Sequence, residues 1–167
     1  MSRWNLGRRF SNNTRRRLSH WRLNRKILPI KVGGSFISRS LESFDKNITS
    51  NLNSRGKKIK RHHLDSTYWV CSKSEFEQIV AFNDIDQRKY IGQRFDCDNF
   101  AISFKGQVAT DFGLNNVGLV IDNSGGHAYN IVVFSNGEVE LFEPQNDSFP
   151  EKGSHQSYSF KNGIILL

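Results

Sequence analysis

The sequence predicts an α+β domain in which a cysteine-bearing helix packs on a small antiparallel sheet, preceded by a basic N-terminal arm. Three observations lead to this prediction. A helical apolar pattern starts at Cys97, β-rich segments separated by turns follow it, and basic side chains are concentrated before residue 62. Helices and strands that are segregated along a chain are typical of α+β domains. A length of 167 residues provides one domain with a core and a tail.

The charge is divided unevenly along the chain. Residues 1–61 hold 17 of the 24 Lys and Arg and only two acids, whereas residues 62–167 hold the other seven and 14 acids. We therefore expect residues 1–63 to form a basic arm and linker, and residues 64–167 to form the folded domain. Within the arm, apolar side chains at positions 37, 41, 44, 48 and 52 have helical spacing and predict an amphipathic helix. The polar stretch 53–63 is expected to be the linker.

Three interpretations of the basic arm stay open. It can be solvated and largely disordered, because a block of like charges repels itself. It can bind phosphates, because arginine donates two parallel hydrogen bonds to them and an indole ring stacks on bases. The candidate residues for that role are Arg8, Arg9, Arg15, Arg16, Arg17, Arg22 and Trp21. Its Arg- and Ser-rich composition, without acids in residues 1–31, also fits an organelle-targeting presequence.

The elements of the domain can be predicted in order. Residues 67–71 are rich in β-formers and predict a strand, and Ser74 with Glu77 forms the capping box of a helix that reaches Asn83. A second helix begins at the N-cap Asp96, with buried positions 100, 101 and 104, and is followed by a loop over 106–116. The later strands are expected at 117–121, 127–134, 138–142 and 163–167. The Asn136-Gly137 step predicts a tight hairpin between two of them.

The chain has two cysteines, Cys71 and Cys97, which are too few for a disulfide scaffold. A thiol in the first turn of a helix is close to unpaired N–H groups and to the positive end of the helix dipole, so its thiolate form is favoured. The alternative is a small buried apolar residue, which is what most free cysteines are. The neighbouring acids Asp96 and Asp98 oppose thiolate formation.

A histidine and a glutamate are expected to lie side by side on the predicted hairpin. Counting outward from its turn places His127 laterally opposite Glu143 or Gln145. A thiol, an imidazole and an orienting acid are the parts of a cysteine nucleophile site. Gln93, four residues before the cysteine, is a candidate oxyanion donor, and Gln145 is a second one. Asn130 is a weaker candidate for orienting the imidazole, because it lies on the opposite face of the strand.

Several short motifs resemble a known family when taken together in order. They are Tyr90, residues 95–101 (FDCDNFA), Val117-Gly118, residues 127–130 (HAYN) and residues 143–145 (EPQ). This pattern resembles the papain-like cysteine-peptidase domain found at the C-terminus of the fairy-ring mushroom agglutinin, with bacterial and phage relatives, and covers residues 65–167. The resemblance implies a papain-like fold, a Cys97–His127–Glu143 triad and calcium-dependent proteolysis. Candidate oxygen ligands for calcium are Asp96, Asp98, Asp111 and Asp122.

Two functions from different classes are therefore expected to compete. The first is a cysteine hydrolase, peptidase-like, that acts on a peptide or related amide of a protein substrate. The second is a non-catalytic basic protein, nucleic-acid-binding or part of a virion, in which residues 1–61 neutralise phosphates. No apolar run is long enough to span a bilayer and no secretory signal is found, so we expect a cytoplasmic or virion-associated protein.

Overall fold

The computed structural model describes residues 36–52 and 59–167. Its main sheet has five strands in the order β2-β7-β4-β5-β6. Neighbouring strands are antiparallel except for the parallel pair of β2 and β7. Their bounds are β2 Ile59–His62, β4 Val117–Asp122, β5 His127–Val133, β6 Val139–Phe142 and β7 Gly163–Leu166. The candidate arginines and Trp21 of the basic arm lie outside the described residues.

Two further strands, three α-helices and two 3-10 helices, η2 (Ile85–Gln87) and η3 (Gln156–Tyr158), complete the described part of the chain. β1 (Ile37–Ser40) and β3 (Thr67–Val70) form a separate antiparallel pair, in register from Ile37 with Val70 to Ser40 with Thr67. The α-helices are α2 (Leu41–Leu52), α3 (Lys73–Phe82) and α4 (Cys97–Phe112). The predicted α+β class is therefore confirmed.

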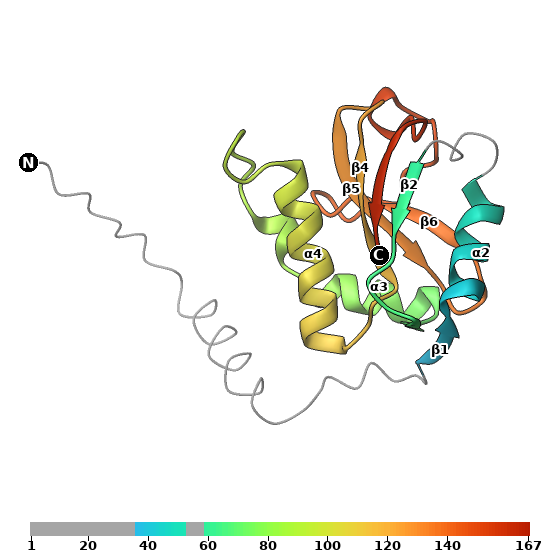
Figure 1. The fold of residues 1–167 in the computed structure, drawn as a ribbon. Coiled ribbons are helices and arrows are strands. Elements are labelled where there is room, and N and C mark those ends of the chain that lie inside the picture. Colours follow the sequence, from blue (N-terminus) through green and yellow to red (C-terminus); the bar gives the residue numbers. More distant parts are fainter. Residues whose placement is uncertain (1–35, 53–58) are drawn as a thin grey trace, which may run out of the picture. The chain divides into compact units, whose positions relative to one another are not determined.

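The main sheet is covered on both faces, and alternate residues of β5 divide the core. Tyr129, Ile131 and Val133 belong to a cluster with Phe44 and Ile48 of α2. The intervening Val132 belongs to a second cluster that contains residues of α3 and α4. Figure 1 shows α2 on one side of the sheet and α3 with α4 on the other. Because side chains alternate along a strand, successive β5 residues face opposite layers.

Four details differ from the sequence predictions. Residues 37–40 pair as a strand, so the predicted helix begins only at Leu41. Residues 59–62, expected in the linker, form β2 beside β7. The capping box of α3 uses Ser72 and Glu75, two residues earlier than predicted. The expected loop over 106–116 is mostly helix, because α4 continues to Phe112 and ends at Gly113, whose φ of 66° few other residues adopt at low cost.

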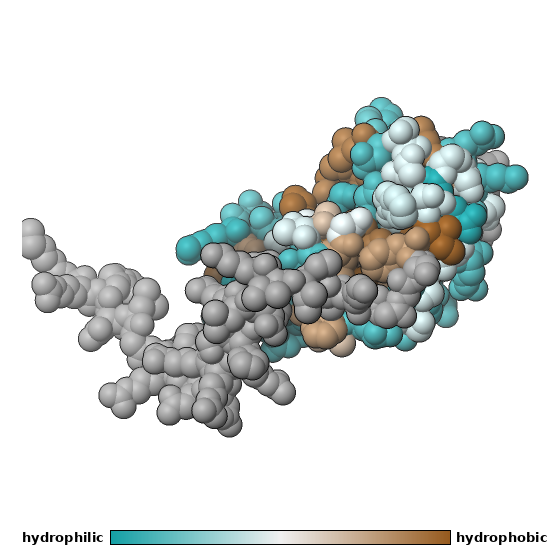
Figure 2. Space-filling view, turned by 90° about the horizontal axis from the view of Figure 1, so that it is seen from below, coloured by the Kyte–Doolittle hydropathy of each residue, from teal (hydrophilic) through white to brown (hydrophobic). Residues whose placement is uncertain are grey.

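The surface of the described residues is mixed in polarity. Figure 2 shows a face on which apolar groups alternate with hydrophilic ones. The large apolar side chains that are exposed include Trp69, Phe82, Tyr90 and Ile102. Among the described residues, no helix is both long enough and apolar enough to cross a membrane.

Candidate functional site

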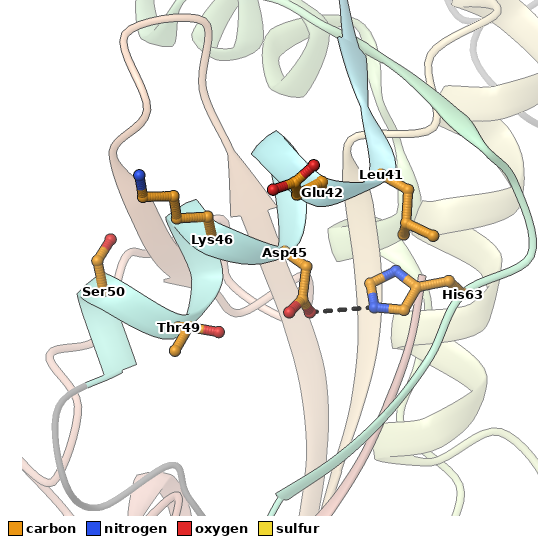
Figure 3. Close-up of a pocket in the computed structure, with 7 residues that line it drawn as sticks. All are labelled: Leu41, Glu42, Asp45, Lys46, Thr49, Ser50 and His63. Atoms are coloured by element: carbon orange, nitrogen blue, oxygen red, sulfur yellow. Dashed lines mark hydrogen bonds and ion pairs between the residues drawn. The ribbon is translucent and has the colours of Figure 1, made fainter.

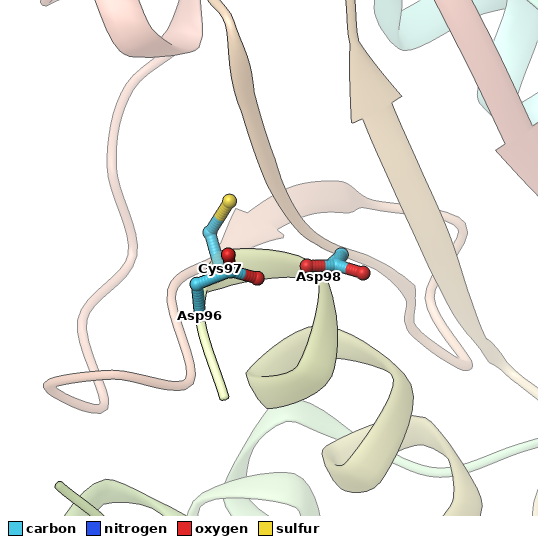
Figure 4. Close-up of side chains that lie close together, drawn as sticks. All are labelled: Asp96, Cys97 and Asp98. Atoms are coloured by element: carbon cyan, nitrogen blue, oxygen red, sulfur yellow. The ribbon is translucent and has the colours of Figure 1, made fainter. Parts of the chain in front are cut away.

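Cys97 is the first residue of α4, as the sequence predicts. Asp96 is the N-cap, and it forms a capping box with Asn99, whose Oδ1 accepts from the Asp96 N–H at 3.2 Å. Phe100, Ala101 and Phe104 are buried and fix the helix against the sheet. The thiol of Cys97 is partly exposed. In Figure 4 its sulfur points out from the start of the helix.

The two acids that flank the thiol interact with each other. The carboxyl of Asp98 hydrogen-bonds to Asp96, and this contact lowers the pKa of Asp96 and raises the pKa of Asp98. The ligand atoms of Asp96, Cys97 and Asp98 lie within 4.8 Å of one another. Calcium prefers six to eight oxygen ligands. The two carboxylates, one of them already accepting from the Gln93 N–H at 2.8 Å, supply only part of such a set.

His127, the first residue of β5, and Glu143, the residue that follows β6, form a direct pair. The imidazole Nε2 donates to Glu143 Oε2 at 2.6 Å, and the Glu143 side chain is only 3% exposed. Burial opposes ionisation of this carboxyl, but hydrogen bonds from His127 and then Tyr158 outweigh it and lower the pKa of Glu143. Glu143 is therefore a buried, charged anchor that fixes the orientation of the His127 ring.

Tyr158 is a member of this site that the sequence analysis missed. Its hydroxyl donates to Glu143 Oε2 at 2.9 Å, and its ring meets the His127 ring edge to face at 5.6 Å. The second carboxylate oxygen of Glu143 accepts from the backbone and side-chain amides of Gln145, both at 3.2 Å. Four donors thus fill the Glu143 carboxylate, so His127, Tyr158 and Gln145 are the groups left to contact a ligand.

The segment that carries Tyr158 is held by a buried aspartate. Asp122, at the end of β4, accepts from the Phe160 N–H at 2.7 Å and from the Tyr129 hydroxyl at 3.1 Å. It also accepts from the Gly125 N–H at 2.9 Å, inside the turn that leads to His127. Asp122 therefore fixes both segments that converge on the site, and its carboxylate is occupied by protein donors.

The remaining predicted residues have separate positions. Asn130 is fully buried and donates to the carbonyls of Ala101 and Gly118, so it links α4 to the sheet on the face opposite His127. Gln93 is exposed and has a positive φ of 61°. Within the described residues, no hydrogen bond connects the Cys97 thiol with the His127 ring. The structure therefore joins the imidazole to the acid by a direct hydrogen bond.

Comparisons with known proteins point to one class. The family model of the ricin-type beta-trefoil lectin C-terminal domain matches residues 45–165. A solved structure described as a PSL1a-E64 complex is similar with a TM-score of 0.60 and 24% identity, over 78% of this chain and 51% of that chain. The Polyporus squamosus lectin bound to Neu5Acα2-6Galβ1-4GlcNAc is similar with a TM-score of 0.57 and 26% identity, over 78% and 49%. A search among curated proteins found no match.

These findings correct the predicted function. The matching family and the named Polyporus structure are lectins, which contradicts the predicted cysteine hydrolase of the peptidase class. They also give no support to the alternative of a nucleic-acid-binding or virion protein. The expected resemblance to the C-terminal part of an agglutinin is confirmed at the level of the lectin family. The chain spans about half the length of the solved lectin chains it resembles.

Proposed function

Because the chain belongs to the ricin-type beta-trefoil lectin C-terminal domain family, we propose that it is a carbohydrate-binding domain of the lectin class. The observation that carries this proposal is the family match over residues 45–165. The Polyporus squamosus lectin, solved with a bound trisaccharide, adds support at 26% identity. We propose that the polar cluster around His127 is a saccharide contact.

The chemistry of this cluster suits a hydroxyl-rich ligand. Nε2 of His127 donates to Glu143, so Nδ1 of the neutral ring is left to accept a hydrogen bond from a sugar hydroxyl. The Gln145 side-chain oxygen is a second acceptor beside it. The ring of Tyr158 supplies an apolar surface next to these groups. A few fixed polar groups beside an aromatic ring give orientation and contact area together.

The proposal also covers the architecture of the domain and the role of the Cys97 thiol. The helix that carries Cys97 packs on the sheet that carries His127, and this arrangement supports a papain-like architecture. Cys97 begins α4 and is partly exposed, so a ligand can reach its thiol. PSL1a was solved in complex with E64, so E64 is a second compound to test for binding to this chain.

The test is calorimetric titration of the full chain with Neu5Acα2-6Galβ1-4GlcNAc and with its neutral fragment Galβ1-4GlcNAc. His127→Ala is expected to weaken binding by about tenfold or more, since it removes a hydrogen bond to the ligand and the ring that Tyr158 packs on. His62→Ala is the matched control, because His62 is exposed on β2. No binding of either saccharide to the wild-type chain would refute the proposal.

A further inference from the structure

A concavity lies beside α2, among residues that the proposed saccharide contact does not use. Its volume is about 600 Å³, within the range of small-ligand sites. Glu42, Lys46 and Thr49 follow one another along the exposed face of the helix, at positions that lie three and four residues apart. His63, just after β2, and Leu41, at the start of α2, also line it. Figure 3 shows these side chains around the opening.

Part of this pocket is rigid. The Asp45 carboxylate accepts from Arg61 Nε at 2.6 Å and from His63 Nε2 at 3.0 Å. The other ring nitrogen of His63 lies 3.3 Å from the hydroxyl of Tyr68, a fully buried residue. Burial opposes ionisation of Asp45, but the Arg61 contact and then His63 outweigh it and lower its pKa. Side chains held by such second contacts are prepared for ligand binding without further ordering.

The rest of the pocket offers unused hydrogen-bonding capacity. Within the described part of the chain, the side chains of Glu42, Lys46 and Thr49 make no hydrogen bond to another residue. Together they present a carboxylate acceptor, an ammonium donor and a hydroxyl that does both. Leu41 adds an aliphatic wall. The pocket therefore offers hydrogen-bond donors, hydrogen-bond acceptors and one apolar contact to a single ligand.

The charges in the pocket select the class of ligand. A cation would need the Asp45 oxygens, which Arg61 and His63 already occupy. An anion would meet the carboxylate of Glu42 beside the ammonium of Lys46. A neutral ligand with several hydroxyls can use the acceptor, the donor and the hydroxyl at once, with no buried charge left unpaired.

We propose that this α2 pocket is a saccharide site that takes a neutral sugar unit, separate from the cluster around His127. The inference rests on the proposed lectin function and adds to it a second position and a ligand class. Glu42 accepts from sugar hydroxyls, and Lys46 and Thr49 donate to sugar oxygens. Leu41 contacts the apolar side of the sugar ring.

The test uses two-dimensional amide NMR of the full chain titrated with Galβ1-4GlcNAc. Perturbed signals are expected along α2 and at His63. Thr49→Trp, which fills the opening from an exposed position, is expected to weaken this binding at least about tenfold. Thr110→Trp is the matched control, because Thr110 is exposed on α4. The unperturbed spectrum of each variant verifies that it folds.

The outcomes separate this inference from the proposed function. Perturbation on α2 that Thr49→Trp removes and Thr110→Trp retains supports the pocket. Perturbation confined to the surroundings of His127 refutes the pocket and leaves the lectin function standing. Binding that Thr49→Trp leaves unchanged also refutes the pocket. If millimolar disaccharide perturbs no signal and the sialylated trisaccharide does not bind, both the α2 pocket and the lectin function are refuted.

Discussion

Replacing Glu143 by glutamine tests the buried anchor of the candidate site. Glu143→Gln keeps the shape of the side chain but exchanges one acceptor oxygen for an amide donor. In the wild-type chain both oxygens accept, from His127 and Tyr158 on one side and from Gln145 on the other. The new NH₂ group must face donors on one of these sides, so at least one buried donor loses its acceptor. A lost buried partner costs about 1–3 kcal/mol, and a charged hydrogen bond is lost as well.

We therefore expect Glu143→Gln to lower the free energy of unfolding by about 2–4 kcal/mol near neutral pH, a large share of a typical total. The folded-state pKa of Glu143 is lowered, so its contribution is present above the ordinary glutamate pKa and is lost as pH falls through the folded-state value. The variant and the wild type should then converge in stability as the pH falls below about 4.3. Urea unfolding at several pH values measures both effects.

A control in β6, just before Glu143, isolates the effect of burial. Glu140 pairs with Lys73 at 2.8 Å, but these side chains are 30% and 42% exposed. Glu140→Gln should therefore cost less than about 1 kcal/mol. A loss for Glu143→Gln no larger than for Glu140→Gln, or a loss equally large at low pH, would refute the assignment of Glu143 as a charged anchor.

Three further predictions concern other parts of the described chain. Cys97 should be alkylated by iodoacetamide far faster than Cys71, because Cys71 is 1% exposed and burial raises the pKa of its thiol to about 12. Mass spectrometry of tryptic peptides measures the two rates, and equal rates would contradict the prediction. Gly118→Ala should destabilise by about 1–3 kcal/mol, since a Cβ there would lie 2.6 Å and 2.7 Å from two apolar side chains; an unchanged melting temperature would contradict this packing. Calcium should leave the melting temperature unchanged, because Asp96 and Asp98 do not form an oxygen cage; a calcium-dependent increase would refute that conclusion.

The parts of the structure that follow local rules could be predicted from the sequence. The Asn136-Gly137 turn fixes the register of β5 and β6, so the proximity of His127 and Glu143 follows from counting outward. The N-cap Asp96 likewise places Cys97 at the start of α4. These contacts need only short stretches of chain and one hairpin.

The parts that depend on distant contacts could not be predicted. The parallel pairing of β2 with β7 joins segments about a hundred residues apart, and no local pattern marks it. α4 continues past Gly106 because the burial of Val108 offsets a glycine cost of about 1 kcal/mol. Tyr158 reaches Glu143 from the 3-10 helix η3, in a segment that Asp122 holds in place, and this three-residue element is too short for periodicity to identify it. The lectin class came from comparison with whole domains, because the same site chemistry occurs in proteins of different function.

A crystal structure of the full chain grown with Galβ1-4GlcNAc tests the central claim, saccharide binding by this domain, most directly. The account predicts a sugar ring in contact with the His127 imidazole and with the Gln145 amide, and a second sugar over Thr49 in the α2 pocket. An ordered structure at saturating disaccharide with no sugar at either position would contradict it.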